Sequence, residues 1–102
     1  MNAKDRIIVA LDVSGLGEAE SLVQELAPYV CCFGVGLQLL TSVGAPKAVE
    51  FLHGLGVKVF LDGKFDDIPN TVGEAAQAAS LLGVAMFNVH ASAGIEAMMA
   101  AV

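Results

Sequence analysis

The chain has 102 residues, of which 56% are hydrophobic and 16% are charged, and its formal net charge is −6. This length suits a single small domain, and the composition is that of a globular protein rather than a disordered one. The acidic balance leaves no basic face for nucleic acid, although a single phosphate ester needs only a few backbone N–H groups. We therefore predict one domain over residues 1–102 that does not bind nucleic acid.

No apolar run approaches the roughly 20 residues that cross a bilayer, and the N-terminus lacks the layout of a secretory signal. Cys31 and Cys32 are adjacent, so an ordinary unstrained disulfide cannot join them. Reduced thiols in an apolar strand fit a cytoplasmic protein. His53 and His90 are not spaced as partners of the cysteines in a metal site. We expect a cytoplasmic chain with no membrane contact and no bound metal.

The first half of the chain alternates short apolar runs with helical patterns. The predicted elements are a strand over 6–13, a helix over 17–30, a strand over 31–36 and a helix over 45–56. Pro46 lies near the start of the second helix, and Gly54 is a suitable residue for its end.

The second half repeats this alternation. Its predicted elements are a strand over 57–65, a helix beginning near Asn70, a strand over 84–90 and a last helix. Asn70 could cap its helix. One face of that helix is apolar, formed by Val72, Ala75, Ala76, Ala79 and Leu82. The last helix is indicated by Ile95, Met98, Met99 and Val102.

The resulting order is βαβαβαβα, which predicts an α/β fold of four βα units with parallel strands. Two architectures accommodate this order, an open doubly wound sheet or part of an eight-stranded barrel. The turn after the first strand contains Gly15 and Gly17 but lacks the third glycine of a dinucleotide-binding fingerprint. An ordinary turn before a helix explains these two glycines better.

Polar residues end three of the four predicted strands: Asp12 ends the first, Asp62 and Lys64 the third, and Asn88 and His90 the fourth. In both architectures ligands bind at the carboxyl ends of the parallel strands. Four strands that point the same way would gather these side chains at one edge of the sheet.

The spacing D-x-K-x-x-D places Asp62, Lys64 and Asp67 at the end of the third strand. Residues i and i+2 of a strand share a face, so Asp62 and Lys64 are expected side by side. Carboxylates on both sides favour the ammonium form of the lysine, which can then deliver a proton to a carbanion. A salt bridge that closes a strand is the structural alternative. His90 is either a hydrogen-bonded structural residue or a contact to the ligand.

Three stretches in order, "IIVALDV", "FLDGKFDDIPNTV" and "NVHASAG", resemble successive motifs of the orotidine 5′-phosphate decarboxylase family. The resemblance covers essentially the whole chain. The D-x-K-x-x-D pattern is shared with hexulose-phosphate synthase, whereas "DIPNT" is much more specific to the orotidylate enzymes.

The resemblance implies a (β/α)8 barrel that works as a homodimer without cofactor or metal and converts OMP to UMP in pyrimidine biosynthesis. By this likeness Asp62 presses against the substrate carboxylate and Lys64 protonates C6 of the pyrimidine. Asp12 contacts the ribose. Asp67 and Thr71 reach into the site of the neighbouring subunit.

The chain departs from the family pattern at three positions: Gly34 replaces a lysine, Gly63 a larger apolar residue, and Asp66 a common histidine. Four βα units are half of a TIM barrel, which needs roughly 200–250 residues. Three readings stay open. They are a decarboxylase-like chain whose own activity is undecided, a sugar-phosphate enzyme of the same superfamily, and a non-catalytic half-barrel fragment or engineered module that self-associates.

Overall fold

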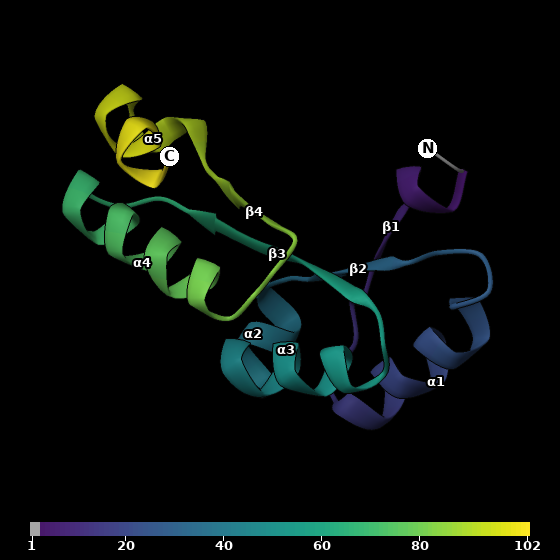
Figure 1. Cartoon of the computed structure of the whole chain (residues 1–102). Coiled ribbons are helices and arrows are strands. Elements are labelled where there is room, and N and C mark those ends of the chain that lie inside the picture. The colour runs from purple at the N-terminus through teal and green to yellow at the C-terminus, as the bar shows by residue number, and fades with distance from the viewer. Residues whose placement is uncertain (1–2) are drawn as a thin grey trace.

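The computed structural model describes residues 3–102 (Figure 1). The strands are β1 (Ile8–Ala10), β2 (Cys32–Val35), β3 (Lys58–Phe65) and β4 (Met86–Val89). The α-helices are α1 (Leu16–Leu26), α2 (Leu37–Ser42), α3 (Ala45–Gly54), α4 (Pro69–Leu81) and α5 (Ile95–Ala101). Two 3₁₀ helices, η1 (Ala3–Arg6) and η2 (Ala91–Ala93), complete the elements.

The four strands form one parallel sheet in the order β1-β2-β3-β4. Ile8 is paired with Cys32, and Cys32 in turn with Lys58, so the amino ends of the first three strands are level. Parallel neighbours joined through helices are βαβ units. The predicted α/β class is therefore confirmed, and the four successive units have the arrangement of half a (β/α)8 barrel.

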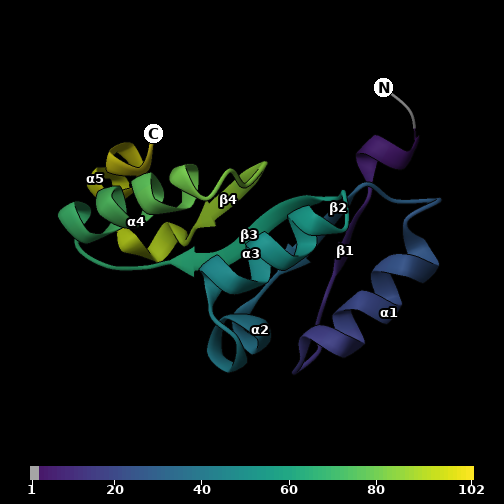
Figure 2. The same ribbon diagram turned by 60° about the horizontal axis from the view of Figure 1, so that its bottom comes forward.

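The two faces of the sheet differ in cover. Alternate residues of the central strands, such as Phe33 and Val59, are fully buried against helix residues that include Val23 and Leu52. Figures 1 and 2 show α1, α2 and α3 gathered on one side of β1, β2 and β3. The opposite face, which we call the inner face, carries Ile8, Ala10, Cys32, Gly34, Phe60 and Met86. Ile8 and Met86 are 40% and 45% exposed on it.

Helix boundaries differ from the predictions where local chemistry is decisive. Helix α1 ends at Leu26 rather than at residue 30, because Pro28 has no backbone N–H with which to continue the helical hydrogen bonds. The predicted cap at Asn70 is wrong: Ile68 is the N-cap of α4, and Pro69 occupies its first turn. A proline suits this position because its missing N–H needs no partner there. The predicted end of α3 at Gly54 is confirmed.

The short helix α2 was not predicted. It has six residues, and its single buried side chain is Leu39. Helix α4 is the longest of the described helices, with 13 residues, and buries Val72, Ala76 and Ala79 as expected. None of the helices within residues 3–102 is both long and apolar enough to pass through a membrane.

Candidate active site

The carboxyl edge of the sheet brings together the polar residues that end its strands. Asp62 lies within β3 and Asn88 within β4, while His90 follows β4 directly and Asp12 lies two residues after the end of β1. Asp12 and His90 are exposed, and within residues 3–102 neither is hydrogen-bonded to Asp62. The predicted common edge is confirmed, and its bonded centre lies on β3 and β4.

An ion pair forms this centre. Lys64 Nζ lies 2.8 Å from Asp62 Oδ1, and the two side chains are 52% and 29% exposed. The neighbouring positions of the aspartate and the lysine agree with the prediction. Both groups remain open to solvent, so a ligand arriving at this edge can reach them.

A bulge in β3, rather than regular strand geometry, creates the pair. The register passes from Leu61 opposite Phe87 to Phe65 opposite Val89, so β3 has extra residues between these points. Lys64 has a φ of 50°, in the left-handed region that residues other than glycine rarely adopt. Bulges commonly redirect side chains next to active sites.

The ring of Phe65 occupies the space beside Gly63, which lies in the same bulge. A Cβ at this position would lie 2.7 Å from Cε1 of Phe65, so the ring must move before a larger residue fits. The Phe65 ring contacts Phe87 with a centroid distance of 5.8 Å. The family pattern and this chain therefore fill the position next to the ion pair differently.

The electrostatics favour an ionised aspartate. Hydrogen bonds from Lys64 and then from Asn88 hold the pKa of Asp62 below its ordinary value, against a smaller opposing effect of burial. A carboxylate kept charged in this way can repel a second anion placed beside it.

Asn88 belongs to the site, although the sequence alone indicates it only as a polar residue at the end of a strand. Its Nδ2 donates to Asp62 Oδ1 at 2.7 Å, and its Oδ1 accepts from the backbone N of Lys64 at 2.8 Å. A polar residue on β4 next to the charged end of β3 is the signal that could have identified it.

Asp67 and Thr71 lie apart from the ion pair within this chain. The Asp67 carboxylate accepts a hydrogen bond from the backbone N of Ile68 at 2.8 Å, and no ion pair joins it to Lys64 in the described part of the chain. Thr71 is exposed in the first turn of α4. The chain alone therefore pairs the lysine with one carboxylate of the predicted two.

His90 belongs to a second small network. Its Nδ1 accepts from the backbone N of Ser92 at 3.1 Å and lies 2.7 Å from Ser92 Oγ. Ser92 Oγ also donates to Asp66 Oδ2 at 2.8 Å. His90 thus caps η2, and the unusual Asp66 has a bonded partner across the loop.

Gly34, which replaces the family lysine, lies on the inner face of β2. A Cβ there would have only ordinary contacts, 3.6 Å to Phe60 and 3.7 Å to Ala10 and to Ile8. The position therefore has room for the first atom of a side chain, and no steric conflict explains the glycine.

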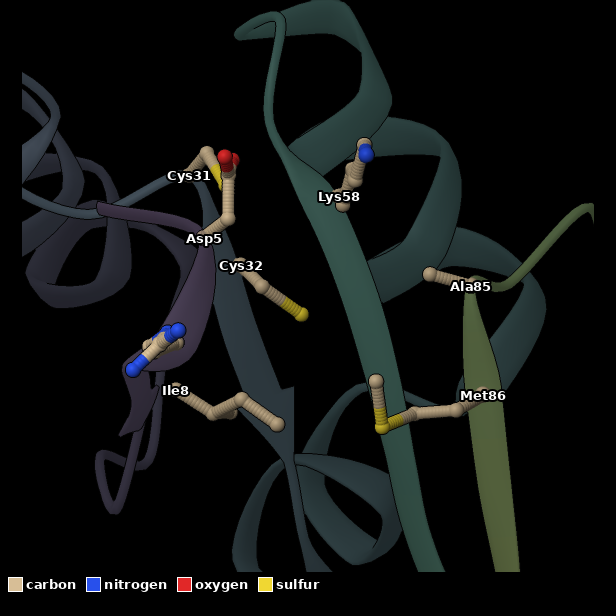
Figure 3. A pocket seen from close by; sticks show the side chains of 8 residues that line it. Asp5, Ile8, Cys31, Cys32, Lys58, Ala85 and Met86 are labelled. Atoms are coloured by element: carbon tan, nitrogen blue, oxygen red, sulfur yellow. The ribbon is translucent and has the colours of Figure 1, made fainter. Parts of the chain in front are cut away.

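A cavity of about 630 Å³ lies at the other end of the sheet, at the amino ends of the strands (Figure 3). It is lined by Asp5, Arg6, Ile8, Cys31, Cys32, Lys58, Ala85 and Met86. In Figure 3 the side chains of Ile8, Cys32 and Met86 point into it. Burial, with a smaller effect of Cys31, raises the pKa of Cys32, and both cysteines are free thiols.

No cluster of three or more histidine, cysteine, aspartate or glutamate side chains within residues 3–102 has an arrangement that could hold a metal ion. The fold and the site define an α/β protein of parallel βα units with a lysine–aspartate pair at the carboxyl edge of its sheet. Enzymes of the barrel type bind their ligands at this edge.

The chain belongs to the orotidine 5′-phosphate decarboxylase / HUMPS family, which matches residues 5–102. It is 52% identical over 101 residues to an orotidine 5′-phosphate decarboxylase of Moorella thermoacetica, covering 99% of the chain and 40% of that relative. The enzyme of the same name from Heliobacterium modesticaldum is 51% identical over 102 residues, with 42% of its length covered. The chain thus spans about two fifths of the length of these curated relatives.

A solved structure is similar in fold. It is described as an uncharacterized conserved protein from Geobacillus kaustophilus, with a TM-score of 0.83 and 40% sequence identity. The match covers 92% of this chain and 43% of that one. The similarity confirms the four-unit fold by an independent comparison.

Proposed function

We propose that the chain acts in the decarboxylation of orotidine 5′-phosphate to UMP, a step of pyrimidine biosynthesis. The observation that carries the proposal is the 2.8 Å pair of Lys64 and Asp62 at the carboxyl edge of a sheet that belongs to this family. The names of the relatives from Moorella and Heliobacterium support the same reaction.

In the proposed reaction the Asp62 carboxylate lies against the carboxylate of the substrate and destabilises it by repulsion. The bond between C6 and the carboxyl carbon breaks, carbon dioxide leaves, and the electron pair stays on C6. The Lys64 ammonium gives its proton to C6 and later regains one from water. The depressed pKa of Asp62 supports this role, because only the charged aspartate repels the substrate.

The remaining site residues are proposed as substrate contacts. Asp12 binds the ribose and His90 lines the nucleotide site, while Asp67 and Thr71 complete the site of a neighbouring subunit in a homodimer. Exposure of all four residues is consistent with such roles. Residues 1–102 would then supply the first four βα units as one domain of a cytoplasmic enzyme.

The test is orotidylate decarboxylation by the purified chain, with Asp62→Ala beside it and Glu74→Ala, an exposed change on α4, as the control. We expect activity that Asp62→Ala abolishes and Glu74→Ala leaves intact. Saturating UMP should raise the Tm of the wild-type chain, because a ligand bound to the folded state stabilises it. Absence of both effects would contradict the proposal. Competition by ribulose 5-phosphate but not by UMP would instead indicate the sugar-phosphate reaction.

The exposed inner face favours a second candidate function, a half barrel that self-associates without catalysis. Ile8 and Met86 are large apolar side chains exposed on this face, and β1 and β4 are the edge strands of the sheet that residues 3–102 form. This candidate predicts a stable oligomer whose Tm does not change with UMP. Sedimentation together with the UMP titration separates the two functions.

A further inference from the structure

Asn88 lies half-buried on β4, and both ends of its side-chain amide are bonded to β3. The NH₂ group donates to the Asp62 carboxylate, and the oxygen accepts from the Lys64 backbone N–H. These partners fix the orientation of the amide. In the reversed orientation its oxygen would face a carboxylate and its NH₂ group a backbone donor, so both contacts would repel.

The segment that Asn88 contacts is the bulge of β3. Residues added at a bulge lose their regular partners in the ladder. Here the backbone N–H of Lys64, the residue with a φ of 50°, is bonded to the Asn88 side chain at 2.8 Å. The amide therefore stabilises the unusual backbone conformation from which the lysine side chain extends.

The same amide also orients the carboxylate. Asp62 Oδ1 accepts from both Lys64 Nζ and Asn88 Nδ2. Oδ2 accepts no hydrogen bond from residues 3–102, and it lies beside Gly36, the residue after β2, where an added Cβ would be 3.8 Å away. One oxygen is held by two donors, and the other stays free at the open edge.

We propose that Asn88 is a positioning residue, which holds Asp62 and Lys64 in their relative orientation through its two amide hydrogen bonds. The nature of the substrate rests on the proposed function, whereas the alignment is a property of the chain alone. Lys64 faces Asp62 from β3, Asn88 faces it from β4, and Gly36, directly after β2, lies beside its second oxygen. The titration of Asp62 therefore reports on the alignment.

Two variants separate positioning of the carboxylate from support of the bulge. Asn88→Asp keeps an acceptor for the Lys64 N–H but replaces the donor to Asp62 by a second carboxylate. Asn88→Ala removes both bonds. Gln77→Ala, an exposed amide on α4, is the matched control.

The experiment is an NMR pH titration of the full chain, following the Asp62 carboxyl carbon, the Asn88 side-chain NH₂ and the Lys64 amide. In the wild type, the Asn88 NH₂ signals should shift together with the titration of Asp62. Both Asn88 variants should raise the Asp62 midpoint, Asn88→Asp the more strongly. Hydrogen exchange at the Lys64 amide should accelerate in Asn88→Ala and stay slow in Asn88→Asp.

The proposal is overturned if the Asn88 NH₂ signals ignore the titration of Asp62, or if the Asp62 midpoint is the same in every variant. The wild-type titration tests the contact between Asn88 and Asp62 even if Asn88→Ala does not fold. Where the chain decarboxylates orotidylate, Asn88→Ala should lower kcat by roughly 10–100-fold, the range known for partners that orient ligands at metal sites, with little change in KM. A chain without activity but with the expected titrations would contradict the proposed function and leave the positioning role supported.

Discussion

The two ends of β3 each present a lysine, in opposite surroundings. At the carboxyl end Lys64 is paired with Asp62, and Asn88 supports both residues. At the amino end Lys58 lines a cavity of about 630 Å³, and its ammonium makes no ion pair with any residue from 3 to 102. The two lysines therefore differ in kind: partners converge on Lys64, whereas Lys58 borders a cavity without an ion-pair partner in the described residues.

The ionisable groups at the two ends shift in opposite directions for different reasons. Hydrogen bonds lower the pKa of Asp62, which favours its charged form. Burial raises the pKa of Cys32 and favours its neutral form. Hydrogen bonds thus favour a charged carboxylate at one end of the sheet, and burial favours a neutral thiol at the other.

The largest expected effect comes from exchanging the two lysines for methionine one at a time. Lys64→Met should lower the rate of orotidylate decarboxylation by roughly 10³-fold or more, because removing one residue of a coupled catalytic unit commonly costs that much in rate. Lys58→Met should leave the rate unchanged. Steady-state kinetics on both variants measures the difference. Equal losses would erase the distinction between the two ends.

Gly34→Lys tests whether the charged network can be extended toward β2. The Cβ has room, and a lysine restores the residue of the family pattern, so we expect the rate to rise by about tenfold or more. Gly34→Ala fills the same space without charge and should change little. A rate that falls in Gly34→Lys would show that this chain has adapted to the glycine.

At the amino end, Cys32 should be a slow nucleophile. Since burial raises its pKa, little thiolate is present at neutral pH, and alkylation by iodoacetamide should be several-fold slower than in the denatured chain. The alkylation rate should rise only at pH values above the usual pKa of a cysteine thiol. Mass spectrometry of Cys31→Ser, which leaves Cys32 as the single thiol, provides the measurement. Fast alkylation at pH 7 would contradict the buried environment.

The smallest effect concerns stability. The folded-state pKa of Asp62 lies below its ordinary value of 3.8, so its stabilisation is present above that value and is lost as the pH falls through the folded-state pKa. The free energy of unfolding should exceed that of Asp62→Asn by about 1 kcal/mol or less at pH 7, the scale of exposed ion pairs. Urea denaturation of both proteins should show this difference vanish in acid. A difference independent of pH would rule out the charge as its source.

Most of the fold could be predicted because each element carries its own periodicity. The helical face of α4, with Val72, Ala76 and Ala79 buried, follows from the spacing of its apolar residues. Helix α2 could not be predicted, since its six residues are too few to show a period. Asn70 is a residue type that often caps helices, but Pro69 fits the first turn of α4, so the helix begins earlier than predicted.

The site was predictable as a set of residue types and not as a set of contacts. Lys64 and Asp62 are near in sequence, so their pairing could be expected, although a bulge and not regular strand geometry produces it. The bond from Asn88 to Asp62 joins residues 26 apart and depends on the register of two strands. The bulge that gives Lys64 its backbone conformation depends on the same register, which no local pattern encodes.

The strand order has a consequence for how the molecule is made. Each strand after β1 pairs with the one that precedes it in the chain, and within residues 3–102 no strand pairs with a distant one. A nascent chain can therefore add one βα unit at a time to the unit already formed, as the ribosome delivers it. Because neighbouring contacts need less loop closure than distant ones, assembly from the N-terminus should be rapid, with the charged edge completed when β4 emerges.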